Sequence, residues 1–448
     1  MFLKNYLLGQ VLVWLIVRKT RQLSGEARIP ASKSHSVRAN FFGLLAEGTS
    51  EAIIHDACAD AYSMAKVVQE LGAKVNIEGN KWVFEGTGGN LKIPYDVLNV
   101  GNSGTGLFIT YAVSALLDSY VVVTGDEQLR YKPGRYGQPL LDALKDLGAK
   151  AAFSVRGDGK PPVVIRGVVK GGKTTIPGIN SQWLTPLLIA MPLAEEDTEV
   201  FVPNLYERPY IEMTLQWVRR VGGRIDHENF EIFHIYGGQT YKPYRFTIPG
   251  DWESACFVLA AGALVEDAEI TIYGVDTRDV QGDKVVVDIL KQMEADITVK
   301  NYGLDGITIR SIGELEGVEV DCKDLPDAIP YLAVLGTYAK GKTVLKNIES
   351  SRLKETDRPA VIKKELEKMG AKIELKENEM IIHHSKLHGA WIDGHMDHRI
   401  IMATAIAGMI AEGVTVISDA EYCSKSFPTF YEVFKSLGAN ILKVKEVV

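Results

Sequence analysis

Cysteine is scarce in this sequence: the 448 residues include four, Cys58, Cys256, Cys322 and Cys423. No two of them stand in a Cys-x-x-Cys pair, so their spacing indicates neither a zinc site nor a disulfide framework. Dispersed thiols of this kind are typical of proteins in a reducing cytoplasm, where disulfides are rare. We therefore expect a cytoplasmic protein whose fold does not depend on disulfides.

A membrane-spanning run is also lacking. The apolar segment at residues 6–17 comprises twelve residues, whereas a helix needs about 20 to cross a bilayer. Arg18, Lys19 and Arg21 follow it, rather than the small residues of a signal-peptide cleavage site. We predict that this segment forms a strand behind an N-terminal extension, with peripheral contact to a membrane as the alternative.

The chain has no excess of basic residues. It carries 50 Lys and Arg against 57 Asp and Glu, a formal net charge of −7. This balance argues against general affinity for nucleic acid or acidic membranes, so any anion must be bound by a local cluster of cations. The apolar content of 46% is typical of a soluble globular protein, and the length predicts two or more domains.

One pattern recurs along the whole chain: a helix-like segment ends in a Leu-Gly-Ala-Lys type sequence and runs into a strand-like segment. Glycine suits a helix C-terminus that turns left-handed, and alternation of apolar and polar residues is typical of a strand. Consecutive copies start 76, 74, 72, 76 and 68 residues apart, which predicts six similar α/β units. The copies begin at Leu71, Leu147, Val221, Met293, Met369 and Leu437.

Six units divide into two groups of three, so we predict two globular domains of similar build, residues 31–249 and 250–448. The turn-rich segments near Pro30 and at 249–251 are the predicted crossing points. If the chain crosses twice, residues 1–30 supply an extension and a strand to the second domain. An active site is then expected in the cleft between the domains, a usual place for ligand sites.

Residues 352–359 read Arg-Leu-Lys-Glu-Thr-Asp-Arg-Pro, with five charged residues among the first seven. A strand is predicted before them and a helix from Pro359, so the run stands at a helix N-terminus, whose amides and dipole favour anions. Lys354 and Arg358 are candidates for binding acidic groups, and Glu355 is a candidate for moving a proton. The alternative is a solvated turn whose ion pairs each contribute about 0–1 kcal/mol.

Four further segments place polar residues or glycines before a predicted helix. Serines can cap such a helix, cations at its start suit an anion, and glycines let backbone amides approach a ligand closely. Lys33 and Arg38 are the cations of the first segment. The segments are 29–38, 101–106, 397–399 and 424–428, and the helices predicted after the first and third are 39–46 and 400–411.

Taken in order, these segments resemble one family, the 5-enolpyruvylshikimate-3-phosphate (EPSP) synthases, or 3-phosphoshikimate 1-carboxyvinyltransferases. The resemblance runs from about Ile29 to Ala439, and the colinear set makes it specific, whereas any single motif would be weak. The matching segments are 32–34, 101–105, Gly125-Asp126, Ser181-Gln182, Arg208-Pro209-Tyr210, 326–328, 354–358, 397–399 and 425–428.

The resemblance implies an α/β fold, a two-domain inside-out α/β barrel of six βαβαββ units with pseudo-threefold symmetry. It implies that the 5-hydroxyl of shikimate 3-phosphate adds to phosphoenolpyruvate and that phosphate is then eliminated, with no metal and no cofactor. Such chemistry needs a base, an acid and many cations. The step belongs to the shikimate pathway to chorismate and aromatic amino acids, a target of glyphosate. We expect small-molecule substrates, no nucleic acid, no membrane span and a monomer.

Carried over to this sequence, the resemblance makes Asp327 the base at the 5-hydroxyl and Glu355 the group that protonates and deprotonates the methylene carbon. Lys33 is implied to touch both substrates and to assist as an acid or by its charge. The residues implied in binding shikimate 3-phosphate are Lys33, Ser34, Arg38, Asn180, Ser181, Gln182, Arg208, Tyr210, Asp327, Ser350 and Lys354. Those implied in binding phosphoenolpyruvate are Lys33, Gly104, Lys132, Gln182, Arg358, His398, Arg399 and Lys425.

Several of these residues also have a purely structural interpretation. Asp327 could cap a helix that begins near Ala328, because aspartate is a favoured N-cap. Tyr210 could pack in the core with its hydroxyl paired. Lys425 could lie on the surface, and His398 could be a buried histidine with satisfied ring nitrogens.

At five positions the chain departs from the family pattern. Loss of a charged hydrogen bond costs about 1.5–3 kcal/mol of binding, so we predict a divergent but active synthase with altered affinity for substrates and inhibitor. Arg208 is a candidate to replace charge beside Glu207. The departures are Phe108 and Lys132 in place of arginine, Asn180 and Glu207 in place of serine, and Ser350 in place of asparagine.

Two other functions stay open at this point. An enolpyruvyl transferase of the same fold could act on another alcohol. Its amino-sugar-nucleotide version is disfavoured, because no cysteine lies between Gly125 and Arg135, where that sister family carries one in a mobile loop. A non-catalytic paralogue could bind phosphorylated ligands, but such a protein has little need for both Asp327 and Glu355.

Overall fold

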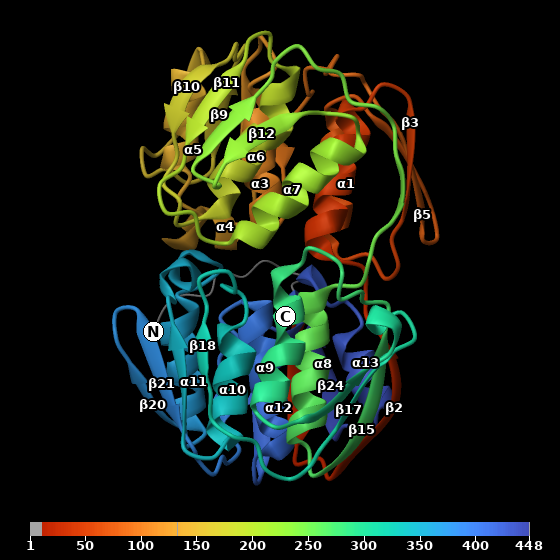
Figure 1. Ribbon diagram of the computed structural model, residues 1–448, viewed down its shortest axis with the longest axis vertical. Helices are drawn as coiled ribbons and strands as arrows, with labels where there is room; N and C mark the ends of the chain where they lie inside the picture. Colours follow the sequence, from red (N-terminus) through yellow and green to blue (C-terminus); the bar gives the residue numbers. More distant parts are fainter. Residues whose placement is uncertain (1–10, 132, 448) are drawn as a thin grey trace.

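Buried apolar side chains form two separate clusters, one in each of two lobes (Figure 1). The computed structural model of the chain describes residues 11–131 and 133–447. The upper lobe in Figure 1 takes its cluster from residues between Ala31 and Ile248. The lower lobe takes its cluster from Val13 to Ile29 and from Trp252 to Ile441.

The chain passes between the lobes twice, and the two crossing segments lie side by side. Ala31 and Gly250 form an antiparallel bridge. The amide of Asp251 donates to the Pro30 carbonyl at 2.8 Å. The lobes are therefore joined by one short double connection near the two turn-rich segments of the sequence.

Within the described ranges, the strands form six four-stranded sheets of one pattern, three in each lobe. In each sheet, three antiparallel strands carry a fourth strand in parallel at one edge. The upper sheets are β14 (Arg245–Thr247), β3 (Thr49–Ile53), β5 (Lys81–Glu85), β4 (Lys74–Glu78); β6 (Leu98–Asn99), β7 (Val121–Thr124), β9 (Val163–Arg166), β8 (Ala151–Ser154); and β10 (Gly172–Thr175), β11 (Thr198–Phe201), β13 (Ile232–Ile235), β12 (Ile225–Glu228). The lower sheets are β16 (Asp296–Val299), β17 (Ile307–Arg310), β15 (Asp267–Tyr273), β2 (Gln22–Arg28); β18 (Glu319–Asp321), β19 (Lys342–Lys346), β21 (Glu379–His383), β20 (Lys372–Leu375); and β22 (Trp391–Ile392), β23 (Val414–Ile417), β1 (Val11–Arg18), β24 (Ile441–Val447).

Three helices at the centre of each lobe are buried on almost every side, as expected for mostly apolar helices. They are α1 (Lys33–Leu45), α3 (Gly104–Ser114) and α6 (Ser181–Ala190) above, and α8 (Trp252–Leu264), α10 (Ile329–Tyr338) and α12 (His398–Ile410) below. Among them, α1 differs in burying the polar residues of its first half. The remaining α-helices are α2 (Ala59–Glu70), α4 (Glu127–Tyr131), α5 (Gln138–Asp146), α7 (Arg208–Arg220), α9 (Val286–Gln292), α11 (Arg358–Lys368) and α13 (Phe430–Ser436). Helices inside and sheets outside agree with the predicted inside-out α/β barrel (Figure 1).

Each of the six repeated sequences forms the predicted helix-to-strand junction. In the first copy, α2 ends at Glu70, Gly72 has a φ of 113°, and β4 begins at Lys74. Only glycine adopts such a φ without strain, which explains its recurrence. The equivalent positive-φ residues in the other copies are Gly148, Gly222, Glu294, Gly370 and Gly438.

The N-terminal strand belongs to the lower lobe, because β1 pairs antiparallel with both β23 and β24. Residues 11–17 are therefore a strand, as predicted, while the rest of the predicted segment, residues 6–10, and the extension before it lie outside the described residues. Among the helices of the described part, none has both the length and the apolar character needed to cross a membrane.

The first helix begins earlier than predicted. α1 starts at Lys33 rather than at residue 39, because Ser32 caps it and its hydroxyl accepts from the His35 amide at 3.5 Å. Lys33 and Arg38 therefore lie within the first two turns of the helix rather than ahead of it.

Candidate active site

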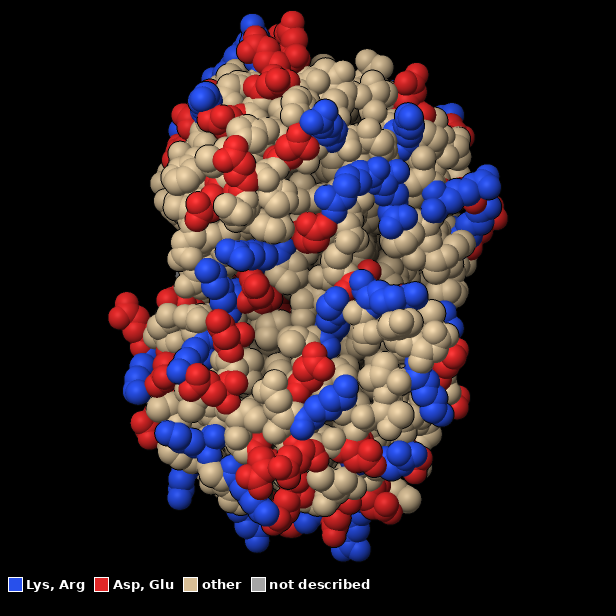
Figure 2. All heavy atoms as spheres, in the orientation of Figure 1, with Lys and Arg blue, Asp and Glu red and all other residues tan. Residues whose placement is uncertain are grey.

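Residues at the starts of α1, α3, α6 and α8, and Asp327 just before α10, line one cavity of about 30 Å³ between the lobes. Arg399, at the start of α12, pairs with two acids of this lining, Glu253 and Asp327. Free amides and the positive ends of the helix dipoles meet there, which creates a centre for binding anions. Figure 2 shows the molecule hollowed where the lobes meet, with basic and acidic side chains around the hollow. The lining residues are Lys33, Ser34, Arg38, Thr105, Arg135, Ser181, Gln182, Thr185, Glu207, Tyr210, Glu253, Asp327, Lys354 and Glu355.

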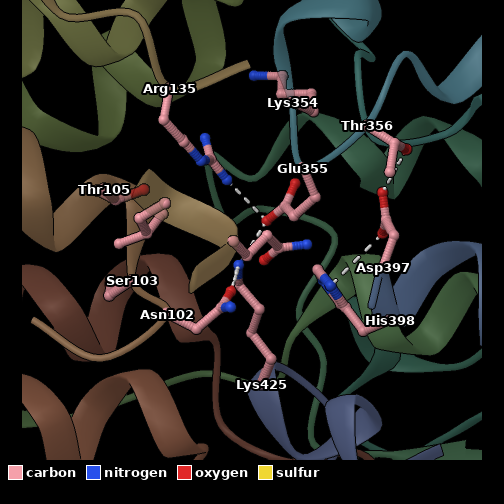
Figure 3. Close-up of polar contacts among 12 residues, drawn as sticks. Asn102, Ser103, Thr105, Arg135, Lys354, Glu355, Thr356, Asp397, His398 and Lys425 are labelled. Carbon is pink, nitrogen blue, oxygen red and sulfur yellow. Dashed lines mark hydrogen bonds and ion pairs between the residues drawn. The ribbon is translucent and has the colours of Figure 1, made fainter. Parts of the chain in front are cut away.

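Glu355 is surrounded by three cations, two of which, Arg135 and Lys425, are labelled in Figure 3. Its carboxylate lies 2.6 Å from Nη2 of Arg358, 2.8 Å from Nη2 of Arg135 and 2.7 Å from Nζ of Lys425. Burial raises the pKa of Glu355, but the charges of Lys425, Arg135 and Arg358 outweigh it and hold this pKa well below its usual range. Without an anion to compete for these cations, Glu355 is therefore ionised.

Asp327 is the second buried acid of the cavity. Its carboxylate accepts from Nε of Arg399 at 3.1 Å, from the Tyr210 hydroxyl at 2.9 Å and from Nη1 of Arg358. Burial raises the pKa of Asp327, and Arg358 and Lys354 then lower it below its ordinary value. The residue is not the cap of α10, since Ala328 is in that position and Asp327 faces the cations.

Arg358 joins both acids to a third carboxylate. Its Nε donates to Oδ2 of Asp397 at 3.0 Å, and Asp397 also accepts from the Thr356 hydroxyl at 2.9 Å. Asp397 caps α12 through the Arg399 amide at 3.0 Å. Burial lowers the pKa of Arg358, but these carboxylates outweigh it and raise the pKa. The guanidinium is thus held at the start of α11 by opposite charges on three sides.

Glu253 is a cavity acid that sequence reasoning missed. It lies in the first turn of α8, directly after the second crossing segment, and pairs with Nη2 of Arg399. It accepts from the Tyr210 hydroxyl at 2.7 Å, and Nζ of Lys33 lies 3.9 Å away. An acid in the first turn of a buried helix was the available signal, because such a charge needs a partner.

Arg38 is held by neutral oxygens. Its guanidinium donates to the carbonyls of Ser34 at 2.9 Å and Tyr210 at 3.1 Å and to the Thr214 hydroxyl at 3.0 Å. Burial lowers its pKa to about 10, so the group remains charged at neutral pH. Within the described residues no carboxylate forms an ion pair with it, which leaves its charge for an anionic ligand.

Arg135 is the second residue that sequence reasoning missed. It ends the 3₁₀ turn η1 (Pro133–Arg135), and besides Glu355 its Nη1 donates to Oε1 of Gln182 at 3.1 Å. A Cβ on Gly104 would overlap this guanidinium, so glycine there makes room for it. The sequence interpretation placed the cation at Lys132, which lies outside the described residues.

His398 and Lys425 lie beside Glu355. His398 is buried, and neither ring nitrogen has a hydrogen-bond partner in the described part of the chain, although Nδ1 lies 3.7 Å from Oδ1 of Asp397. Burial, followed by the charge of Lys33, lowers its pKa well below the usual range, so the ring is neutral. Lys425, in η6 (Ala420–Lys425), is buried and also contacts the Asn102 carboxamide, so it is not a surface lysine.

Ser181, Glu207 and Lys354 form a cluster on the other side of the cavity. Oε2 of Glu207 accepts from the Ser181 hydroxyl at 2.6 Å, and Oε1 lies 2.6 Å from Nζ of Lys354. Gln182, next to Ser181, donates to the Thr105 hydroxyl at 3.0 Å. Lys354 follows the 3₁₀ turn η5 (Glu349–Leu353), so this cluster joins the two lobes.

Other predicted residues lie around the cavity rather than in its lining. Asn180 caps α6 by accepting from the Gln182 amide at 3.0 Å. Ser350 is buried, and its hydroxyl has no partner among the described residues. Arg208 is exposed, with its guanidinium 5.9 Å from the centre of the Phe230 ring, so the structure does not bring it to the others. Phe108, in place of the family arginine, packs in the core.

Comparisons with known proteins agree on one family. The model of the EPSP synthase (3-phosphoshikimate 1-carboxyvinyltransferase) family matches residues 17–434. A 3-phosphoshikimate 1-carboxyvinyltransferase of Acetivibrio thermocellus is 46% identical over 431 residues, covering 95% of this chain and 99% of the relative. One of Methanocaldococcus jannaschii is 42% identical over 434 residues, with 95% and 99% covered.

The fold gives the same result. A structure of EPSP synthase from Acinetobacter baumannii superposes with a TM-score of 0.80 at 28% identity, covering 97% of this chain and all of that one. The predicted fold class is thereby confirmed, and so is the predicted family. The chain belongs to the EPSP synthase family.

Proposed function

We propose that the cavity between the lobes is where this enzyme transfers the enolpyruvyl group of phosphoenolpyruvate to the 5-hydroxyl of shikimate 3-phosphate, releasing phosphate. One observation carries the assignment: two buried acids, Asp327 and Glu355, lie among cations from both lobes in a cavity lined by the starts of several central helices. Two polyanionic reactants need such a concentration of positive charge, and addition followed by elimination needs two proton-transfer groups.

Asp327 is proposed to take the proton of the 5-hydroxyl. It is ionised because Arg358 and Lys354 lower its pKa, and the Tyr210 hydroxyl at 2.9 Å and Arg399 orient it. Phosphate and carboxylate groups of the bound substrates would draw these cations away from it. Its pKa then rises towards the value a general base needs.

Glu355 is proposed to give a proton to the methylene carbon and to take one back in the elimination step. Its pKa is held low by Lys425, Arg135 and Arg358. Phosphoenolpyruvate carries negative groups that would engage these same three cations, which raises the pKa of Glu355 and allows it to hold the proton. Binding of phosphoenolpyruvate thus converts Glu355 into its protonated form, which can donate the proton.

The two substrates are proposed to share Lys33 and Gln182, each binding its own set of residues beside them. Shikimate 3-phosphate is assigned to one set and phosphoenolpyruvate to another. Arginine suits both because its planar fork donates two parallel hydrogen bonds. The first set is Ser34, Arg38, Asn180, Ser181, Tyr210, Ser350 and Lys354, and the second is Gly104, Arg135, Arg358, His398, Arg399 and Lys425.

Residues 31–249 and 250–448, with 1–30 attached to the second range, are proposed as the domains that close on the substrates. We also propose that the enzyme is a monomer in the cytoplasm. The four buried, unbridged cysteines fit a reducing compartment. Size-exclusion chromatography with light scattering tests the monomer, and a dimer mass would contradict it.

Phosphate release from phosphoenolpyruvate tests the function, measured with shikimate 3-phosphate, with other phosphorylated alcohols and without acceptor. Release that depends on shikimate 3-phosphate and yields its enolpyruvyl ether is the expected result. Turnover with another alcohol alone would contradict the assigned acceptor. Binding of shikimate 3-phosphate without turnover in any mixture would contradict the catalytic assignment.

A further inference from the structure

Glu207 is a buried carboxylate that the proposed reaction does not use. It lines the cavity, its side chain is 0% exposed, and different donors engage its two oxygens. Oε2 accepts from the Ser181 hydroxyl at 2.6 Å and from the Ser181 amide at 3.1 Å. Oε1 lies 2.6 Å from Nζ of Lys354, which is itself buried.

These donors make up an anion-binding set. Ser181 is the first residue of α6, so its amide is one of the N–H groups at the positive end of the helix dipole. An amide, a hydroxyl and an ammonium group that converge on two oxygens are donors of the kind that hold a phosphate at a helix start. In this chain, the group they hold is the carboxylate of Glu207.

The backbone keeps Glu207 in place. The residue has a φ of 60°, in the left-handed region, immediately before α7. Its carbonyl accepts from the Tyr210 amide at 3.1 Å, and its amide donates to the Lys323 carbonyl at 3.2 Å. Because the turn is held at both ends, rotation of the side chain is the simple way for the carboxylate to leave its donors.

The charges of the cavity lining also indicate that Glu207 opposes binding of a phosphate. Asp327 and Glu355 have roles in the proposed reaction, and Glu253 pairs with Arg399 and Tyr210. Glu207 has no role in the reaction, and its partners are the proposed phosphate ligands Ser181 and Lys354. A phosphorylated acceptor therefore meets an additional like charge at this helix start. The described lining has four basic side chains, Lys33, Arg38, Arg135 and Lys354, against four acidic ones, Glu207, Glu253, Asp327 and Glu355.

We propose that Glu207 determines acceptor specificity, because it occupies the donors that take the phosphate of the acceptor. This inference rests on the proposed function, in which Ser181 and Lys354 bind the phosphate of shikimate 3-phosphate. The phosphate must displace the carboxylate or share Lys354 with it, so like-charge repulsion weakens its binding. The enzyme consequently discriminates less strongly against the same alcohol without its phosphate, shikimate, and uses it as a second acceptor.

The test compares kcat/KM for shikimate 3-phosphate with kcat/KM for shikimate in the wild-type enzyme, Glu207→Gln and Glu207→Asn. Glutamine keeps the length of the side chain without its charge, and asparagine tolerates the left-handed backbone. In both variants we expect the acceptor ratio, kcat/KM for shikimate 3-phosphate divided by kcat/KM for shikimate, to rise at least about tenfold through a lower KM for shikimate 3-phosphate. The KM for phosphoenolpyruvate should not change. An unchanged ratio in the folded variants, or no wild-type turnover of shikimate, would overturn the proposal.

Glu349→Gln is the matched control. It removes the same charge from η5, outside the cavity lining, where Glu349 accepts from the Tyr206 hydroxyl at 3.4 Å. The acceptor ratio should equal that of the wild-type enzyme. Thermal melting followed by circular dichroism shows whether each variant is folded, so a failure of Glu207→Gln to fold leaves Glu207→Asn to decide.

Ser181→Ala separates this inference from the proposed function. If it leaves the KM for shikimate 3-phosphate unchanged, the phosphate does not bind at α6 and the placement of the substrate is wrong. If it raises that KM while both Glu207 variants keep the wild-type ratio, the placement stands and the specificity role of Glu207 is wrong.

Discussion

The two lobes prepare the cavity in different ways. In the lower lobe, Arg358 is surrounded by the carboxylates of Glu355, Asp327 and Asp397, so the two acids proposed for catalysis are positioned by opposite charge. In the upper lobe, Arg38 is positioned by two carbonyls and a hydroxyl, all neutral. The lower lobe therefore holds the proposed proton-transfer groups in a charged network, whereas the upper lobe keeps the guanidinium of Arg38 available for an anion.

This difference has an energetic consequence. Loss of one partner from a buried ion-pair network leaves uncompensated charge and costs about 3–5 kcal/mol, whereas loss of a neutral hydrogen bond that leaves a buried group unsatisfied costs about 1–3 kcal/mol. Substitutions in the lower lobe should therefore reduce stability and catalysis together. Those in the upper lobe should act chiefly on substrate binding.

The largest effect is expected for Arg358→Met compared with Arg38→Met. The first leaves three buried carboxylates without their shared cation and should lower the free energy of unfolding by about 3–5 kcal/mol. The second leaves neutral oxygens unsatisfied, so it should cost about 1–3 kcal/mol and raise the KM for shikimate 3-phosphate. Urea denaturation measures both values, and equal losses would contradict the distinction between the lobes.

The second-largest effect is expected for substitutions of the two acids Asp327 and Glu355. Asp327→Ala and Glu355→Gln should each lower kcat by at least about 10²-fold, because each removes a proton-transfer group. Phosphate release measures kcat, and circular dichroism checks that the variants are folded. Glu412→Gln is a matched control, since Glu412 is an exposed acid of the same lobe, paired with Lys19 at 2.6 Å. A near-normal rate in either acid variant would remove its assigned role.

The buried, neutral His398 should make the free energy of unfolding depend on pH. Its folded pKa is lowered by burial and by Lys33, so on acidification the unfolded state takes up a proton that the folded state refuses. Stability is therefore lost as the pH falls below about 6.5, by up to about 1.4 kcal/mol per pH unit. Urea denaturation between pH 7 and pH 5 should show a smaller loss for His398→Asn than for the wild-type protein. The exposed His388→Asn is the control, and equal losses in all three would contradict this origin.

Asp327 and Glu355, the acids of the lower lobe, affect the free energy of unfolding at lower pH than His398. Their folded pKa values are depressed, so their contribution to stability is present above about pH 4, near their unfolded values, and is lost as the pH falls through the folded values. Removal of His398 should leave this second decline in place.

The smallest effect is expected for Gln182→Ala in the upper lobe. Gln182 donates to Thr105 and accepts from Arg135, and these bonds position Arg135 beside Glu355. Loss of one neutral hydrogen-bonding side chain should raise the KM of each substrate by roughly 2–10-fold with little change in the free energy of unfolding. Steady-state kinetics with each substrate varied in turn measures it, and a hundredfold fall in kcat would place Gln182 with the catalytic acids instead.

Local sequence patterns predicted the repeated fold well. The six helix-to-strand junctions, five of them with glycine, and the strand and helix on either side of residues 352–359 follow from short-range rules of capping and alternation. α1 starts six residues before the predicted residue 39, because Ser32 caps the helix ahead of its apolar run. The departure at Glu207 was recognised, but its partners Ser181 and Lys354, 26 and 147 residues away, were not.

The missed residues share a cause. Arg135 and Glu253 occur in segments that contribute to the site only after the lobes meet. No local pattern distinguishes Arg135 from a surface charge, and the one signal for Glu253 is its place in the first turn of a buried helix. Arg208 shows the converse, since it stands beside two cavity residues in sequence and yet points outward over Phe230. Neighbouring side chains on a helix start diverge, so sequence proximity does not decide which of them reaches a cavity.

By itself, the sequence determined the family, the six α/β units and the residue types available for the chemistry, because these depend on short-range propensity and on the order of motifs. Only the tertiary structure decided which charges meet. Glu355 is ionised because Arg135 and Lys425 reach it from positions 220 and 70 residues away in the chain, and Glu207 occupies an anion site because Ser181 and Lys354 converge on it from different lobes. Coulomb interactions depend on distance through space and on burial, neither of which is encoded in a short stretch of sequence.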